Sequence, residues 1–426
     1  TPEHETPEAT YLEIPVSRDR AANAAILTVG GRKVVLKPGV WSPWVKLEFN
    51  LRMPWFLPDN TVAGIGRFYL QEVAPNFRLY ISPINFNPAD PAGPISEPKD
   101  FAPKLASAVG PFTTTGFKED FATLRNRVFN DDEFLKQATF VLEERLRLWE
   151  HAIQNYDDGL LFFYFSSSDL QSHMFWWHGD DEHPSRPPEQ AAHYFGVIRK
   201  LYQRLDQVVG DLYDRYGGLA TIIVMSDHGF ANFGWQFDLN TWLLQSGYIA
   251  PGNCTSILGD EVDWSQTKAY GLGINGLYLN LKGREANGCV EPGREADELV
   301  EALTARLLRV EWLDKPVIRN VYRASQVYSG SALAFAPDLI VGYHRGFRAS
   351  WDTCLGGVNP TGDAISPNKD AWSADHCVDA LEVPGVMWCS KPIRGQNPAL
   401  VDLAPSILAE YGLETPATMT GRNVIG

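Results

Sequence analysis

The stretch Thr221-Ile-Ile-Val-Met-Ser-Asp-His-Gly-Phe230 decides the fold. Its β-branched, apolar run ends at the pair Asp227-His228, and Gly229 follows directly. In α/β proteins, ligands and metals bind at the carboxyl ends of strands. Adjacent carboxylate and imidazole side chains can both reach one divalent cation when the chain turns at once, and a glycine permits that turn. The stretch therefore predicts a buried strand that ends in two metal ligands.

Helical and apolar segments alternate ahead of this strand. Asn130 and Glu133 form a capping-box pattern, which predicts the start of a one-faced helix. The continuous apolar run at residues 160–165 predicts a buried strand, and residues 187–216 predict a long helix. The order helix, strand, helix, strand is typical of parallel sheets with helices on their faces. We therefore expect an α/β fold with a mostly parallel sheet flanked by helices.

The first part of the chain has a different pattern. Two apolar runs at residues 25–36, separated by Gly30-Gly31, predict a hairpin with a two-residue turn. Further strand candidates bring the expected total to about five antiparallel strands before Pro83. We expect residues 1–83 to form a β-rich inserted subdomain. Residues 84–426 would form the α/β domain, with a connector or cap at residues 84–130.

Composition limits the functional classes. The net charge is −15, with 52 acidic and 37 basic residues, which argues against a surface that coats nucleic acid. No apolar run approaches the roughly 20 residues that span a bilayer, so no membrane span is expected. The five cysteines include no CxxC pair. Cysteine usage favours a reducing, cytoplasmic compartment, and a processed exported protein stays an alternative.

Two further sets of possible ligands accompany the Asp227-His228 pair. Asp169 and His173 lie four residues apart, just past the predicted strand at 160–165, and one helical turn would place both on one face. Far downstream, His376 follows Asp375 seven residues before a predicted strand at 383–389. Because all three sets lie on the ligand-binding side of the expected sheet, they predict a cluster of divalent metal ions.

The pattern Asp169-x-x-x-His173, Ser226-Asp227-His228-Gly229 and a late His376 resembles the alkaline phosphatase superfamily. The nearest branch is that of type I phosphodiesterases and nucleotide pyrophosphatases, together with bacterial phosphohydrolase/phosphomutase-like proteins. The resemblance covers residues 130–426 and rests on the order and spacing of the ligand sets. Residues 1–83 then look like an insertion in that fold.

The resemblance implies two divalent metal ions, usually zinc and sometimes manganese. By this resemblance Asp169, His173 and His376 would hold one ion, while Asp227 and His228 would hold the other. Two cations about 4 Å apart can clamp an in-line displacement at phosphorus. The oxygen and nitrogen ligands suit zinc and manganese alike.

The sequence departs from this family at its N-terminal side. Members begin with a strand that ends in a metal-binding Asp, and a Thr or Ser nucleophile follows, whereas no matching segment is found here. Neither the threonines at 113–115 nor the serines at 166–168 fit the family order. We therefore expect the nucleophile to lie upstream, in an N-terminal fragment of the same protein that would supply a central strand.

The expected function is divalent-metal-dependent hydrolysis of a phosphodiester, pyrophosphate or phosphomonoester, acting on a small phosphorylated substrate. The alternative is a catalytically inactive family member that keeps its metals and serves as a structural or assembly protein. Other polar groups have structural interpretations. The acidic segment between His178 and His183 is interpreted as a solvated loop rather than a cation site. A surface turn and a phosphate contact are equally compatible with His344, Arg345 and Arg348.

Overall fold

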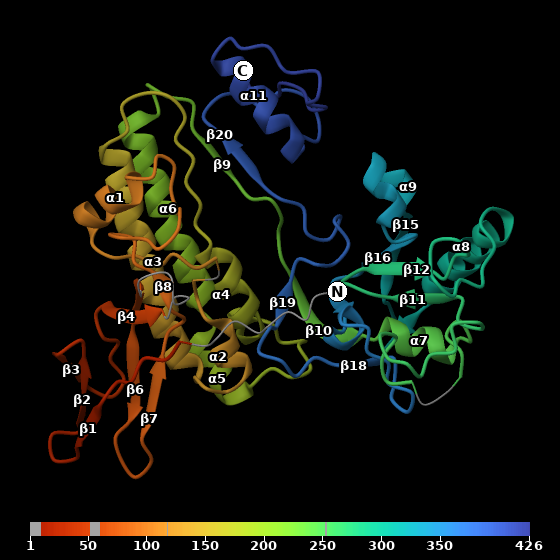
Figure 1. Ribbon diagram of the computed structural model, residues 1–426. Coiled ribbons are helices and arrows are strands. Elements are labelled where there is room, and N and C mark those ends of the chain that lie inside the picture. Colours follow the sequence, from red (N-terminus) through yellow and green to blue (C-terminus); the bar gives the residue numbers. More distant parts are fainter. Residues whose placement is uncertain (1–9, 52–59, 117, 252–253) are drawn as a thin grey trace. The chain divides into compact units, whose positions relative to one another are not determined.

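The computed structural model describes residues 10–51, 60–116, 118–251 and 254–426 (Figure 1). Its chain divides into two compact units, residues 1–170 and 171–426. The fold is mixed, with helices and several small sheets. Within the described residues no helix has both the length and the apolar character to cross a membrane. The boundary expected at residue 83 stays a prediction.

The described pairings of the N-proximal β-rich block are antiparallel, as predicted, but seven described strands precede Pro83 rather than about five. The hairpin of β2 (Ala24–Val29) and β3 (Arg32–Leu36) closes with Val29 opposite Arg32, and Gly30 and Gly31 between them both have positive φ. That backbone geometry is the one a two-residue hairpin turn requires. The remaining strands of the block are β1 (Val16–Asp19), β4 (Val45–Leu51), β5 (Asn60–Gly66), β6 (Phe68–Glu72), β7 (Arg78–Ile81) and β8 (Asn85–Phe86), paired as β1–β2, β4–β5–β8 and β6–β7.

Helix α3 (Asp131–Gln154) is the longest element of this unit. The predicted capping box is present, because Asn130 accepts a hydrogen bond from the Glu133 N–H and the Glu133 carboxylate accepts one from the Asn130 N–H. Its buried face packs in the unit's interior. The other helices here are α1 (Phe101–Val109), α2 (Phe121–Arg125) and the first half of α4 (Ser167–Phe175).

The strand predicted at residues 160–165 is not formed. The segment contains no assigned strand, and Leu160, Phe162 and Tyr164 are exposed while the residues between them are half-buried. Phe163 and Phe165 pack against Trp149 of α3. This alternation is that of an extended chain with one packed face. A strand also needs a second strand beside it, and no strand among the described residues pairs with this segment.

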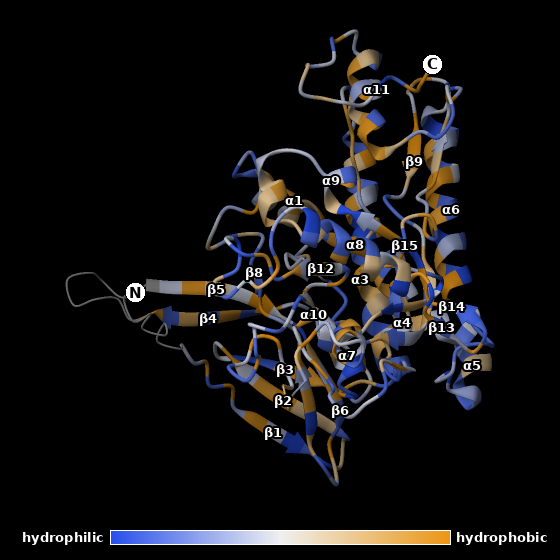
Figure 2. Ribbon diagram, turned by 90° about the vertical axis from the view of Figure 1, so that its right-hand side faces the viewer, coloured by the Kyte–Doolittle hydropathy of each residue, from blue (hydrophilic) through white to orange (hydrophobic). Residues whose placement is uncertain are grey.

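The second unit contains the predicted strand of the opening stretch as β9 (Ile223–Met225), which is half-buried rather than buried. It pairs antiparallel with β20 (Met387–Cys389) in a two-stranded sheet. The long helix predicted before it is divided at Phe195-Gly196 into α5 (Pro188–Tyr194) and α6 (Val197–Tyr216). Apolar and polar residues alternate along α6, as Figure 2 shows.

The predicted mostly parallel sheet is wrong for the sheets that the structure describes. Among the pairings between described strands, only that of β10 (Ala231–Phe237) with β17 (Gly346–Ala349) is parallel, and β10 also pairs antiparallel with β18 (Ile365–Pro367) and β19 (Ala374–Asp375). A second sheet has the order β11–β12–β16–β15 and is antiparallel throughout. Its strands are Ala269–Gly271, Gly276–Leu279, Leu339–Tyr343 and Ile318–Arg323.

Helices pack with these two sheets around one apolar core. Residues from β10, β12 and β16 meet residues from α7 (Leu239–Gln245) and α8 (Arg294–Leu307) in that core. The remaining elements of the unit are short. They are η1 (Trp176–Gly179), β13 (Glu311–Trp312), β14 (Lys315–Pro316), α9 (Ala324–Val327), η2 (Ser331–Phe335), α10 (Trp351–Cys354), η3 (Leu400–Asp402) and α11 (Leu403–Glu410).

Candidate metal centre

Asp169 and His173 lie one turn apart on α4, as their spacing predicts. The His173 side chain is buried, and its ring stacks on Trp372 with a centroid distance of 3.6 Å. Its Nδ1 lies 2.6 Å from the Ala374 carbonyl oxygen. A carbonyl only accepts, so Nδ1 carries the proton and Nε2 is the ring nitrogen that would bind a metal.

His376 follows β19 directly and meets two other histidines. Its ring centroid lies 5.2 Å from that of His173 and 3.6 Å from that of His228, on which it stacks at 18°. His173 and His376 belong to a group of potential ligands whose atoms lie within 4.8 Å of one another. Asp169, on the same continuous helix as His173, completes that group. Three segments distant in sequence thus bring imidazole nitrogens to one place.

Asp227 and His228 follow the end of β9 in the loop 226–229. The His228 Nδ1 lies 3.0 Å from the Gly229 carbonyl oxygen, and its Nε2 lies 3.6 Å from Asp227 Oδ1. The Asp227 side chain is largely exposed. These two residues are not in a group of three close ligands among the described residues. Their predicted role as the second metal set stays a prediction.

The loop 226–229 is fixed against the segment 383–386. The Gly229 N–H donates to the Val383 carbonyl, the Ser226 N–H donates to the Val386 carbonyl, and the Val386 N–H donates to Ser226 Oγ. The two backbones are so close that a Cβ on Gly229 would lie 2.8 Å from the Pro384 carbonyl oxygen. Because His376 precedes this segment by a few residues, the contact holds two ligand-bearing loops together.

A second group of potential ligands is Asp375, His376 and Cys377. Both Asp375 carboxylate oxygens already have donors: Oδ1 accepts from the His376 and Cys377 N–H groups, and Oδ2 accepts from Trp372 Nε1. Burial, together with the nearby Asp375 carboxylate, raises the pKa of the Cys377 thiol to about 12. Of these three, His376 is therefore the residue best suited to bind a metal.

Arg348 lies on β17 and ends in the core rather than at a phosphate-binding surface. Its Nε is 2.7 Å from Asp375 Oδ2, and both side chains are almost fully buried. Burial alone would raise the pKa of Asp375, but the Arg348 charge and the hydrogen bonds from Cys377 and Trp372 together contribute to holding this pKa below its ordinary value. The surface turn that the sequence allowed for Arg348 is wrong, because this side chain is buried, and sequence reasoning missed Trp372 and Asp375 as site residues. The repeat of Asp-His at 375–376, like that at 227–228, was the available signal.

The other polar candidates are engaged in the fold. His183 Nε2 lies 3.0 Å from the Phe233 carbonyl, while its Nδ1 accepts from the Ser185 N–H. His178 and His183 are both buried, so the solvated loop expected around them is wrong for the two histidines. His344 contacts the Glu382 carboxylate at 3.0 Å, and Arg345 donates to the Glu382 carbonyl. None of these side chains adds a ligand to the histidine cluster.

The hydroxyl candidates for the nucleophile belong to the first unit. Thr114 Oγ1 bonds Asn85 and Phe86, and Ser168 Oγ bonds the Phe165 carbonyl. Ser167 is buried and interacts with Glu119, whose carboxylate oxygens have no hydrogen bond of good geometry. Burial raises the pKa of Glu119, and the nearby Asp169 charge adds to this effect. The position of the nucleophile stays a prediction.

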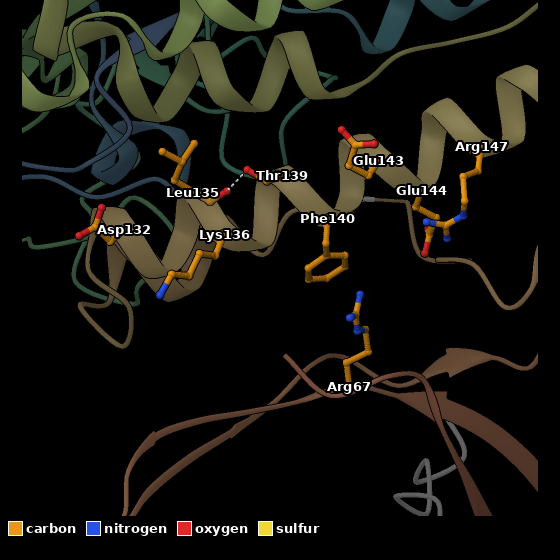
Figure 3. Close-up of a pocket in the computed structure, with 9 residues that line it drawn as sticks. All are labelled: Arg67, Asp132, Leu135, Lys136, Thr139, Phe140, Glu143, Glu144 and Arg147. Carbon is orange, nitrogen blue, oxygen red and sulfur yellow. Dashed lines mark hydrogen bonds between the residues drawn. The ribbon is translucent and has the colours of Figure 1, made fainter. Parts of the chain in front are cut away.

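A cavity of about 560 Å³ lies in the first unit (Figure 3). Arg67 faces Phe140 of α3 across it, with the guanidinium 4.1 Å from the ring centre. Its charged lining residues balance, with Arg67, Lys136 and Arg147 against Asp132, Glu143 and Glu144. The cavity has no histidine or cysteine among its lining residues, and we regard it as a structural feature.

Comparisons with known proteins place most of the chain in one family. The model of one family, type I phosphodiesterase / nucleotide pyrophosphatase, matches residues 84–352, more than half of the chain. That match includes four of the five predicted ligands and stops before His376. A search of curated proteins finds no match.

Proposed function

Because the chain belongs to the type I phosphodiesterase/nucleotide pyrophosphatase family, within the alkaline phosphatase superfamily, we propose that it hydrolyses phosphoric esters at a divalent-metal centre. The family supports phosphoester hydrolysis in general, and a phosphodiester or pyrophosphate is the proposed substrate class. The metal centre is proposed because His173, His228 and His376 converge. The centre of the His376 ring lies 5.2 Å from that of His173 and 3.6 Å from that of His228.

The donor set fits zinc or manganese. Imidazole nitrogen and carboxylate oxygen are ligands for both ions. Asp169, His173 and His376 would hold one ion, and Asp227 with His228 the other. When bound, such ions offset the charge of the phosphoryl group and lower the pKa of a hydroxyl or water.

The residues around the ligands orient them. The Ala374 carbonyl fixes the tautomer and rotation of His173, and the Gly229 carbonyl does the same for His228. Bonds from outer partners of this kind also make the ligating nitrogen more basic. The chain thus supplies ligands in fixed orientations, which is most of what a protein contributes to phosphoryl transfer.

We further propose that a Thr or Ser nucleophile comes from a polypeptide segment upstream of this sequence. Two features support this. The extended apolar segment 160–165 is paired with no strand among the described residues, and β9 pairs there only with β20. A further strand could pair with either segment. In this proposal the hydroxyl attacks phosphorus, the alcohol or phosphate leaves, and water then releases the phosphoryl group from the hydroxyl oxygen.

The test is hydrolysis of a nitrophenyl phosphodiester before and after metal removal with a chelator. The variant Asp227→Asn should lower turnover at least about 100-fold, because a metal ligand is weakened. Its exposed side chain should leave the fold intact, as circular dichroism would verify. Glu298→Gln, on the exposed face of α8, serves as the control. Chelator-resistant turnover, or an Asp227→Asn variant as fast as the parent, contradicts the assignment.

Intact-mass analysis of the active protein tests the upstream segment. The expected result is activity only in material that contains polypeptide beyond residues 1–426. If residues 1–426 alone turn over the diester, the nucleophile lies within this chain. Metal binding without any hydrolysis, even with the upstream segment present, would instead support a catalytically inactive, structural member.

A further inference from the structure

One buried pair of opposite charges lies directly behind the histidine cluster. Arg348 and Asp375 have side-chain exposures of 1% and 2%, and Arg348 Nε is 2.7 Å from Asp375 Oδ2. The N–H is not aimed well enough to form a regular hydrogen bond, so the contact is an ion pair. Removing two charges from water at this depth has a large desolvation cost. Such a pair is therefore weak evidence for stability and suggests a role in positioning other groups.

Asp375 connects this pair to His376. Its Oδ1 accepts from the His376 N–H at 2.8 Å and from the Cys377 N–H at 2.9 Å. These two bonds hold the backbone of the ligand loop in one conformation. With Arg348 and Trp372 on Oδ2, the carboxylate is saturated, which removes Asp375 as a direct ligand and leaves it a positioning role.

Trp372 connects the same carboxylate to His173. Its Nε1 donates to Asp375 Oδ2 at 2.8 Å, and its ring stacks on the His173 imidazole at 26°. The segment also holds His173 through backbone groups, since Ser373 donates from both N and Oγ to the His173 carbonyl. One carboxylate therefore controls the surroundings of two predicted ligands that are about 200 residues apart.

Arg348 is itself held in place. Its guanidinium lies 4.0 Å from the centre of the Trp351 ring and 5.1 Å from that of Phe233, and Nη1 donates to the Ala349 carbonyl. Stacking between aromatic rings fixes the plane of the guanidinium. The charge that orients Asp375 is thus rigid.

We propose that Arg348, Asp375 and Trp372 form a buried positioning unit that sets the orientation of His173 and His376 for metal binding. This inference rests on the proposed metal centre and extends it to residues that do not contact the ion. If this unit exists, the affinity for the metal, and not only the rate of catalysis, depends on the hydrogen bond from the Trp372 indole to the Asp375 carboxylate.

The test measures the zinc affinity of the whole chain by competition with a chromophoric chelator. Trp372→Phe keeps a ring for stacking but removes the Nε1 donor, and Asp375→Asn keeps an oxygen acceptor but removes the charge. Each should raise the zinc Kd about 10- to 100-fold, the usual range for outer-shell partners. The visible absorption of Co²⁺-loaded protein should change in both, because the ligand geometry changes.

Asp338→Asn is the matched control. Asp338 forms an ion pair with Arg284 at 2.7 Å in the same unit and accepts the Leu279 N–H, and neither of these partners belongs to the histidine cluster. This variant should lower the thermal midpoint of the metal-free protein while its zinc Kd stays within about twofold of the parent's, because only the ligand surroundings set that Kd. A loss of affinity in this variant would show that general destabilisation, not positioning, weakens metal binding.

The outcomes separate the two proposals. If the parent binds zinc and both Trp372→Phe and Asp375→Asn keep its Kd and Co²⁺ spectrum, the positioning unit is refuted while the metal centre stands. If the parent chain binds neither zinc nor Co²⁺, the proposed metal centre is refuted, and this inference falls with it.

Discussion

Removing the charge of Asp375 should destabilise the protein more than removing the charge of Arg348. Asp375→Asn leaves Arg348 charged and buried at 1% exposure, because a guanidinium does not lose its proton in a protein. Breaking a buried ion pair in this way costs about 3–5 kcal/mol. Arg348→Met should cost less, since the remaining carboxylate keeps three donors and can take up a proton.

The double variant tests the coupling. Arg348→Met with Asp375→Asn removes both charges, keeps an acceptor for the loop N–H groups, and should recover most of the loss from Asp375→Asn. At an effective dielectric constant of about 20, two charges 2.7 Å apart attract by roughly 6 kcal/mol, so the coupling should be large.

Urea unfolding of metal-free protein, followed by circular dichroism, measures these free energies. Measurements without metal separate the stability effect from the affinity effect described above. The reasoning is refuted if Asp375→Asn costs less than about 1 kcal/mol, or if the double variant loses the sum of the two single losses.

Three further changes test other parts of the structure. Burial lowers the pKa of His183, so the unfolded chain takes up a proton first as the pH falls below about 6.5, and stability is lost there. His183→Gln should reduce the difference in stability between pH 7 and pH 5, and an unchanged difference would contradict this. Burial raises the pKa of Glu119, so the charged carboxylate destabilises the folded protein above that pKa. Glu119→Gln should therefore stabilise metal-free protein at neutral pH by about 1–3 kcal/mol in thermal or urea unfolding. Destabilisation by this variant would contradict the prediction. Asn130→Ala removes the cap of α3 and should cost about 1 kcal/mol, whereas Lys136→Ala, on the exposed face of the same helix, should cost less than half of that.

Local signals in the sequence predicted local structure well. The capping box of α3 and the hairpin turn at Gly30-Gly31 depend on residues within a few positions of one another, and both are present. The run at 160–165 has the composition of a buried strand, but a strand also needs a partner, and composition does not provide one. The direction of pairing between β9 and β20 is likewise set by distant chain segments.

The site was predictable to the same extent. Residue type and spacing made Asp169 with His173 and the pair Asp227-His228 candidates for metal ligands, because few side-chain types bind metals. The structure brings Asp169, His173 and His376 together, and the role of all these residues as ligands stays a prediction. The contacts that orient them were not predictable. His173 and Ala374 are 201 positions apart, and no periodicity relates them. The sequence does not distinguish an arginine that faces solvent from one that faces a buried carboxylate. The role of Arg348 could therefore be recognised only from the three-dimensional structure.

The contact between the loop 226–229 and the segment 383–386 is reciprocal. A Cβ on Gly385 would lie 2.5 Å from the Ser226 carbonyl oxygen, just as one on Gly229 would meet Pro384. Neither backbone can therefore carry even one methyl group here without displacing the other. A methyl group added at Gly385 would push the backbone of the loop 226–229 and thereby shift the imidazole of His228. A substitution at this glycine would therefore change the metal centre, although Gly385 itself binds no ligand.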